Sequence, residues 1–402
     1  MNPEATARLS ELLTQVTGFI YPNEIEIHWS ILIVVYPYIT GLVAGAFILA
    51  SLENVFNVEE VRPTYRLALL TAFSFMVVAP LPLLLHLGHP ERFYEILLAP
   101  NLTSAMAMFG FVYGWYLMGV LLLEVWFEYR RDLIILARRA PVPMRWIYRA
   151  ASLFSSDISE AALAFDQKAI RAITIVGIPS AFLLHGYVGF IFGSVKANPW
   201  WSSVLIPIVF LMSAIVSGIA LVIFLYMILA AIRKEQVDMK CLDTITSYLF
   251  YAVIVDFTLE ALDFTHRLYE SEESVRILGT LIRQKLFLSL IVLQILLGML
   301  VPLAILIVAK WHQLSEDGRK LLYFTAVILI QVGIFSTRWN IVIGGQLFSK
   351  SFRGLMEYKM AIMGLEGFLT ALALLILPFV VLAVLIKMLP TKPLLDEAHT
   401  AA

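Results

Sequence analysis

The sequence predicts an all-α protein, a polytopic membrane helix bundle of about nine transmembrane helices. Apolar residues make up 60% of the 402-residue chain and charged residues only 15%. A soluble domain carries about 25% charged residues. The apolar residues are gathered in long runs, and a run of about 20 residues crosses the hydrocarbon core of a bilayer as a helix.

Nine runs are long enough to span a membrane. They lie at roughly 28–52, 66–88, 103–127, 168–194, 203–231, 244–267, 284–310, 320–347 and 359–389. The chain is thereby divided into a segment 1–26, a transmembrane bundle 27–390 and a tail 391–402. Residues 1–26 lack the basic and apolar regions of a cleavable signal peptide. We expect them to form an amphipathic segment at the outer membrane surface.

Basic residues predict the orientation of the bundle. The connection 128–167 carries six arginines, which are Arg130, Arg131, Arg138, Arg139, Arg145 and Arg149. Cytoplasmic connections are enriched in Lys and Arg, so this loop is expected inside. Nine spans then place the N-terminus outside and the C-terminus inside. Lys350 and Arg353 fall in an outer connection, so the bias is incomplete.

Charge and cysteine content exclude several classes of function. A formal net charge of −1, with no basic patch interleaved with aromatic residues, argues against a nucleic-acid partner. Cys241 is the single cysteine. A disulfide within the chain, a Cys-ligated iron–sulfur cluster and covalent c-type haem each require at least two cysteines. We therefore expect no metal bound through cysteines of this chain.

Four ionisable residues in the sixth run are the first candidates for chemistry. Asp256, Glu260, Asp263 and Arg267 are spaced four, three and four residues apart and so share one helix face. Along the expected helix these residues lie at positions from the middle of the membrane to its outer surface. An ionisable group in hydrocarbon costs a few kcal/mol, so it needs a partner or a use. The stripe fits either a proton path or a structural salt-bridge network.

Arg338 lies well inside the eighth run and needs a carboxylate partner on another helix, for which Glu260 and Asp263 are candidates. Two acids flank the start of the ninth run, Glu357 and Glu366. Nine residues of continuous helix turn them about 180° apart, so they need not serve one site.

Histidines gather at the outer ends of the runs. The outer set is His28, His86, His89, His185 and His266, and only His312 and His399 lie inside. A b-type haem needs two axial histidines at matching depth on facing helices. A second pair of histidines near the inner face is missing, which argues against electron transfer across the membrane through two haems. One b-type haem near the outer face remains an alternative.

A quinone head-group site is the other interpretation of the outer histidines. Such a site needs a His or Tyr for a carbonyl oxygen, a carboxylate for the proton and an apolar slot for the tail. His185, Tyr187, Asp263 and Glu260 would supply these groups.

Several segments, taken in order, resemble the NrfD/PsrC family of membrane subunits. They are HWSILIVVYPYITGLVAGAFILASL, HLGHPERFYEILLAPNLTSAMAMFGFVYGWY, LHGYVGFIFG, RWNIVIGGQ and EYKMAIMGLEGFL. Trp339 stands where the family has Tyr, and nine spans differ from the eight or ten of relatives. Chain length and the segments HLGHPERF and HGYVGF favour the DsrP-like subgroup, from a complex of dissimilatory sulfur metabolism. HybB-like membership is the alternative.

The resemblance implies a subunit of a prokaryotic cytoplasmic membrane complex without a metal of its own. It would exchange electrons between menaquinone or ubiquinone and a ferredoxin-like iron–sulfur subunit on the outer face, beside other membrane and cytochrome subunits. It points to His86, His185 and Tyr187 as quinone-binding residues, with Arg92 and Ser104 as further candidates.

Two alternatives remain beside this quinone subunit. The first is a b-haem cytochrome, and the second is a proton-coupled transporter, although the inverted repeats common in that class are not evident. A proton path through Asp256 is a further hypothesis, extended inward by Glu366, Glu124, Gln294 and Gln331. The direction of electron flow, the quinone type and the terminal substrate are not written in the sequence.

Overall fold

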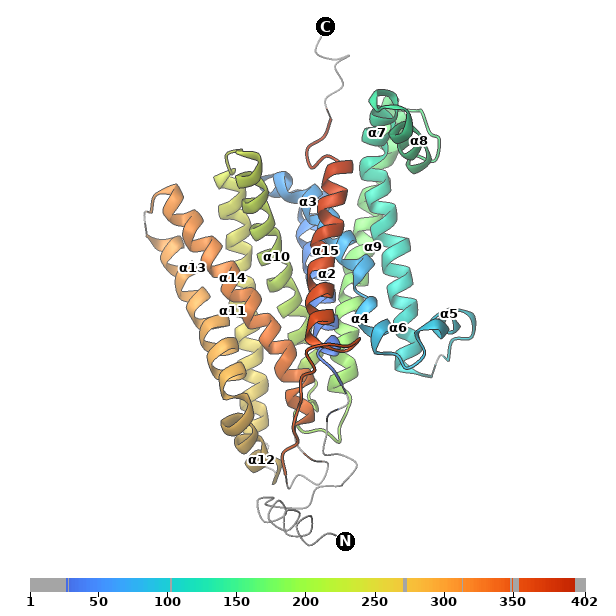
Figure 1. Ribbon diagram of the computed structural model, residues 1–402. Helices are drawn as coiled ribbons and strands as arrows, with labels where there is room; N and C mark the ends of the chain where they lie inside the picture. The colour runs from blue at the N-terminus through green and yellow to red at the C-terminus, as the bar shows by residue number, and fades with distance from the viewer. Residues whose placement is uncertain are drawn as a thin grey trace.

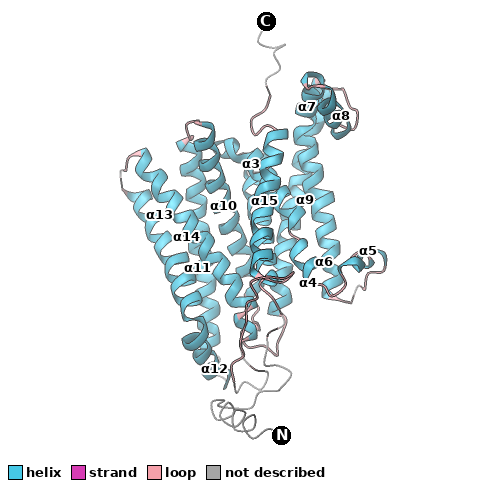
Figure 2. Cartoon of the chain, in the orientation of Figure 1, coloured by secondary structure: helices cyan, strands magenta, loops and turns pink. Residues whose placement is uncertain are grey.

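The computed structural model describes residues 27, 29–101, 103–269, 273–312, 314–347, 349 and 354–394. The segment 1–26, His28, His399, Lys350, Arg353 and the end of the predicted tail lie outside these residues. Within them, nine helices are long and apolar enough to cross a membrane. The predicted all-α class with nine spans is therefore confirmed, and Figure 2 shows helices throughout the bundle.

Two helices form the centre of the bundle, α2 (Leu32–Asn54) and α10 (Ile206–Arg233). They pack closely because small residues face each other along the crossing. A Cβ atom on Gly45 would lie 2.8 Å from the Cα of Gly218 and would also overlap the Ala214 carbonyl. Such close backbone approach stabilises helix pairs in lipid, where no hydrophobic effect acts between helices.

The remaining spans surround this pair (Figure 1). They are α3 (Arg62–Val78) with α4 (Leu81–His86), α6 (Ala105–Gly114) with the π-helical η4 (Trp115–Leu121) and α7 (Leu122–Arg139), α9 (Glu160–Gly193), α11 (Met239–Tyr269), the π-helical η5 (Ile282–Leu300) with α13 (Val301–Trp311), α14 (Glu316–Val342) and α15 (Phe368–Met388). In Figure 1, α11, α13 and α14 lie on one flank, whereas α4, α6, α7 and α9 lie on the other.

The two ends of the bundle differ. At the upper end in Figure 1, helix α8 (Val142–Ala151) connects α7 and α9, and at the lower end α12 (Glu273–Leu281) leads into η5. We call these the α8 end and the α12 end. α2 starts at the α12 end and α15 finishes at the α8 end (Figure 1).

The predicted loop 128–167 is mostly helical. α7 continues to Arg139, and α9 begins at Glu160, so both helices extend past the predicted span ends. Arg130 on α7 forms an ion pair with Asp166 on α9, with a nitrogen–oxygen distance of 2.6 Å. This pairing satisfies the two charges between the helices and allows both to run on beyond the apolar stretch.

The expected start of the ninth span at 359 is wrong. α15 begins at Phe368, and the preceding residues form a turn in which the Phe368 amide donates to the Ala361 carbonyl at 2.9 Å. Gly364 has φ +103°, a conformation that L side chains rarely adopt and that interrupts the helix. Glu357 and Glu366 therefore lie outside the helix, and the predicted half-turn relationship between them does not apply.

Candidate functional site

A fully buried arginine and histidine meet at the centre of the bundle. One terminal guanidinium nitrogen of Arg338 on α14 lies 3.2 Å from Nε2 of His185 on α9 and donates to Oγ of Ser213 on α10 at 2.7 Å. Arg338 and His185 have no exposed surface. The guanidinium also lies over the Phe210 ring, 4.3 Å from its centre. This contact joins three helices in the interior.

Arg338 contacts His185 and Ser213 and not the carboxylate partner expected from the sequence, so that expectation is corrected. Among the described residues, no carboxylate lies within ion-pair distance of the guanidinium. Asp256 and Glu260 still interact with it electrostatically through space. Asp263, the other expected partner, pairs with Arg267 instead.

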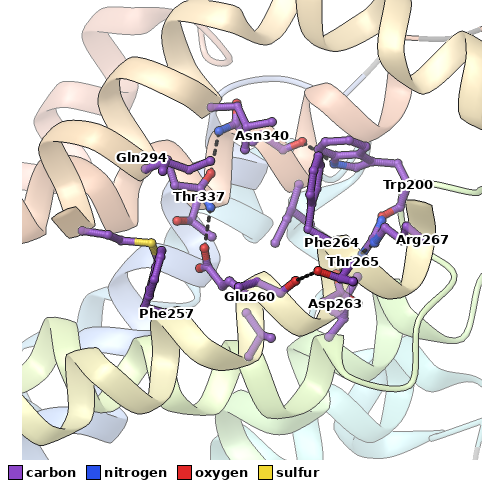
Figure 3. Close-up of a pocket in the computed structure, with 17 residues that line it drawn as sticks. Trp200, Phe257, Glu260, Asp263, Phe264, Thr265, Arg267, Gln294, Thr337 and Asn340 are labelled. Atoms are coloured by element: carbon purple, nitrogen blue, oxygen red, sulfur yellow. Dashed lines mark hydrogen bonds and ion pairs between the residues drawn. The ribbon is translucent and has the colours of Figure 1, made fainter. Parts of the chain in front are cut away.

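A cavity of about 330 Å³ lies beside this centre, between α11, η5 and α14. Figure 3 shows Glu260, Gln294, Thr337 and Asn340 around it, with the aromatic rings of Phe257 and Phe264. Phe264, one of the residues that line the cavity, is 39% exposed on the outside of the bundle. An apolar pocket with a few polar groups is typical of small-molecule sites.

A chain of hydrogen bonds orders the polar side of the cavity. The Gln294 amide donates to Oε2 of Glu260 at 2.8 Å, and the Asn340 amide donates to Oε1 of Gln294 at 2.7 Å. Ser289 donates in turn to the Asn340 side chain at 2.5 Å. The Trp200 indole donates to the main-chain carbonyl of Asn340 at 2.8 Å. The side-chain amides of Gln294 and Asn340 each donate one hydrogen bond and accept another. Their orientations are therefore defined, and so is that of the Glu260 carboxyl group.

Two carboxyl oxygens in this region are buried without a hydrogen-bond partner among the described residues. They are Oε1 of Glu260 and Oδ1 of Asp256. A buried polar atom without a partner costs free energy, and such atoms concentrate where a ligand or a proton is handled. Asp256 is 2% exposed and does not line the cavity, whereas Glu260 does.

An ion pair closes the cavity toward the α12 end. Arg267 donates to Oδ2 of Asp263 at 2.6 Å, and Ser203 donates to the other oxygen of that carboxylate. The Arg267 guanidinium also lies 5.6 Å from the centre of the Trp200 ring. Asp263 is thus fully paired, which distinguishes it from Glu260.

The other predicted quinone-binding residues do not line this cavity. His86 ends α4 on the opposite flank, where its Nδ1 lies 3.2 Å from a Glu366 oxygen at an ion-pair distance without hydrogen-bond geometry. Arg92 is exposed, and Ser104 precedes α6. Tyr187 is half-buried on α9. His185 does not line the cavity either, but it contacts Arg338 on α14, the helix that also carries the cavity residues Thr337 and Asn340.

The expected inward proton path is divided among separate contacts. Glu366 is close to His86, and Glu124 accepts a hydrogen bond from Thr174 at 2.9 Å. Gln331 accepts from Tyr38 at 2.8 Å. Gln294 is the member of the expected path that hydrogen-bonds to a stripe carboxylate, Glu260.

Sequence reasoning missed Ser213, Thr40, Ser289 and Trp200 as partners of the site. Serine and threonine are common in membrane helices and give no signal of their own. η5 is a stronger clue, because π-helical segments occur frequently at functional sites. That helix type is not readable from residue pattern. Among the described residues, no group of three or more His, Cys, Asp or Glu side chains could hold a metal ion.

Comparison with known proteins identifies relatives of the chain. The family model described as "Polysulphide reductase, NrfD" matches residues 22–350. A selenate reductase subunit of Mesobacillus selenatarsenatis is 31% identical over 78% of this chain and 73% of its own length. The Hdr-like menaquinol oxidoreductase integral membrane subunit of Archaeoglobus fulgidus is 24% identical over 86% and 78%. Protein NrfD of Escherichia coli is 25% identical over 56% and 65%.

Proposed function

Because this chain belongs to the NrfD family of multi-pass integral membrane subunits, we propose that it is the quinone-reactive membrane subunit of a multi-subunit redox complex. In this proposal the quinone head group binds in the cavity beside Glu260. Menaquinone is the favoured quinone, because the relative from Archaeoglobus fulgidus is named as a subunit of a menaquinol oxidoreductase.

One observation carries the proposal. The Glu260 carboxyl group is oriented by Gln294 through one oxygen, while its other oxygen is buried beside a cavity of about 330 Å³ with no hydrogen-bond partner in the described part of the chain. A quinol hydroxyl group would donate a hydrogen bond to that oxygen, and a protonated Glu260 would donate to a quinone carbonyl oxygen. The apolar tail of the quinone would leave past Phe264 toward the lipid.

The residues present can carry out the proton part of quinol oxidation. Oxidation of a quinol releases two electrons, which would pass to the proposed iron–sulfur subunit, and two protons, one of which would go to Glu260 and the other to bulk water. Glu260 would accept a proton at Oε1, and the Gln294–Asn340 chain would hold the carboxyl group in position for it. Asp256 lies one helical turn further from the α12 end. The buried charge of Arg338 would stabilise negative charge on both acids.

Partner proteins are proposed from the names of the relatives. The relative from Mesobacillus selenatarsenatis is named as one subunit of a selenate reductase, which supports a membrane anchor for a multi-subunit reductase. We place a ferredoxin-like iron–sulfur subunit at the α12 end, nearest the cavity, with further membrane and cytochrome subunits in the complex. A DsrP-like role in sulfur metabolism is the finer proposal, and the proteins that copurify with the full chain test it.

The variant Glu260→Gln tests the proposed function. It keeps the shape of the side chain beside Gln294 but removes the proton acceptor. We therefore expect the rate of quinol oxidation by the assembled complex to fall about 10²–10⁴-fold. Glu357→Gln is the matched control, because Glu357 is an exposed acid 3.9 Å from Lys285 and outside the cavity. An unchanged rate for Glu260→Gln would contradict the assignment.

A second set of three variants distinguishes the two flanks. The family resemblance assigns the quinone to His86 and Tyr187, which lie away from the Glu260 cavity. If the cavity binds the quinone, Tyr187→Phe and His86→Gln retain quinone affinity, whereas Gln294→Leu lowers it. The opposite result would move the quinone site to the α4–α9 flank and leave the proposed class of function intact.

A further inference from the structure

The α8 end carries arginines that lack acidic partners. Arg130 is neutralised by Asp166, as described above. In contrast, no carboxylate of the described residues forms an ion pair with four neighbouring arginines, which are Arg138, Arg139, Arg145 and Arg149. The Nε atom of Arg145 is buried with no hydrogen-bond acceptor among the residues that the structure describes. This cluster therefore presents uncompensated positive charge.

A niche of about 290 Å³ lies between two of these arginines. Its walls include Arg138, Arg149, Phe154, Ser155 and Ser156. Arg138 donates one hydrogen bond to the Ser156 carbonyl at 3.1 Å, which leaves further guanidinium N–H groups for a ligand. Two guanidinium groups with serine hydroxyls form a donor set suited to a phosphate group.

Exposed apolar side chains lie next to the same niche, and one of them, Phe154, lines it. On α8, Trp146 is 59% exposed, and the Arg149 guanidinium lies 5.7 Å from its ring centre. Leu153 and Phe154 follow α8 and are 71% and 69% exposed. Both have positive φ, 52° and 57°, which is uncommon for residues other than glycine. The backbone thus adopts a costly conformation that presents two large apolar side chains outward.

Contacts with neighbouring spans place α8 at the depth of the membrane surface. Tyr148, on the buried side of α8, donates to the carbonyl of Met388, the last residue of α15, at 3.2 Å. The Trp126 indole on α7 donates to the carbonyl of Ala151, the last residue of α8, at 3.0 Å. Helix α8 is therefore attached beside the end of an apolar span, where lipid head groups would lie.

We propose that the arginine niche between α7 and α8 binds the phosphate head group of an anionic phospholipid, with Trp146 and Phe154 inserted among the adjoining acyl chains. Charge complementarity favours an anion, and the exposed apolar rim favours one that belongs to the bilayer. This inference is independent of the quinone proposal, since no residue of the Glu260 cavity takes part.

Lipid retention by the purified full chain tests the proposal. In a neutral detergent, native mass spectrometry would count bound dioleoylphosphatidylglycerol and dioleoylphosphatidylcholine supplied at equal concentration. We expect a clear preference for phosphatidylglycerol. Removing two arginines in R138Q/R149Q should lower its affinity about 30-fold, since each basic residue near an anionic surface contributes about 1 kcal/mol.

Matched variants separate charge, apolar contact and folding. The control R62Q/R233Q removes two arginines at the same end, one paired with Glu53 and one bonded to Thr391, and should retain the lipid. R138K/R149K keeps the charge and should retain most binding. W146Q/F154Q should weaken phosphatidylglycerol binding while the arginines remain.

Three results would overturn the proposal. The first is equal retention of the two lipids by the wild-type chain, and the second is unchanged retention in R138Q/R149Q. The third is displacement of the lipid by millimolar inorganic phosphate with no effect of W146Q/F154Q. That last result would assign the niche to a soluble anion instead. If R138Q/R149Q fails to fold, R138K/R149K and W146Q/F154Q still decide the question.

Discussion

The Arg338 guanidinium donates to Nε2 of His185 at 3.2 Å, and this contact defines which nitrogen of the imidazole carries the proton. Nε2 must be an acceptor, because arginine has only donors. On the other side of the ring, Nδ1 lies 3.3 Å from Oγ1 of Thr40, whose own proton is donated to the Tyr36 carbonyl. Nδ1 therefore carries the hydrogen, and the histidine is held as one neutral tautomer.

Replacing His185 tests this contact. His185→Leu leaves a buried guanidinium N–H without an acceptor, so we expect the free energy of unfolding to fall by about 1–3 kcal/mol. His185→Gln offers an amide oxygen to Arg338 and should lose less. Denaturant unfolding in detergent micelles measures both variants. Equal stability of His185→Leu and the wild-type chain would contradict the contact.

Asp256 is the acid on which the proton-path hypothesis depends. Asp256→Asn preserves the shape of the side chain but cannot exchange a proton. If the assembled complex translocates protons, we expect translocation in proteoliposomes to be abolished, whereas quinone affinity stays unchanged because Asp256 does not line the cavity. Glu124→Gln is the comparison variant, because Glu124 accepts a hydrogen bond from Thr174 on the other flank of the bundle. Unaltered proton stoichiometry in Asp256→Asn would remove the hypothesis.

The cavity wall depends on contact between two glycines. A Cβ atom on Gly333 of α14 would overlap the backbone of Gly298 in η5. We expect Gly333→Val to destabilise the chain by about 1–3 kcal/mol and to weaken quinone binding, because η5 also carries Gln294. Gly279→Val is the control, since its Cβ would meet nothing within 4 Å. Thermal unfolding and quinone titration measure the two effects, and identical behaviour of the variants would be inconsistent with this packing.

The b-haem alternative predicts a spectrum that we do not expect. Axial ligation requires a free ring nitrogen on each of two facing histidines. Both nitrogens of His185 are engaged, which removes this histidine as an axial ligand, whereas at His86 and His89 the carboxylates of Glu366 and Glu91 lie beside Nδ1. The dithionite-reduced minus oxidised spectrum of the purified chain should lack a haem α-band. A band that disappears in His86→Ala would revive the cytochrome interpretation.

Part of the candidate site could be predicted from the sequence. The spacing of Asp256, Glu260 and Asp263 places them on one helix face whatever surrounds it, because helical periodicity is a local property. The nine spans follow in the same way, since lipid requires long apolar helices that satisfy their own backbone. The start of α15 at Phe368 was missed because the apolar pattern continues through a turn that depends on Gly364.

Partners across helices required knowledge of how the helices pack. Residue spacing marks Arg338 as buried but cannot say whether His185, Ser213 or a carboxylate faces it. Those neighbours result from close contacts such as Gly45 with Gly218, which set the rotation and depth of each helix in lipid. The chain's linear order therefore specifies spans and the acidic face of α11. The tertiary structure decides that Glu260 is the acid with an unpartnered oxygen beside a cavity, because this depends on contacts between residues distant in sequence.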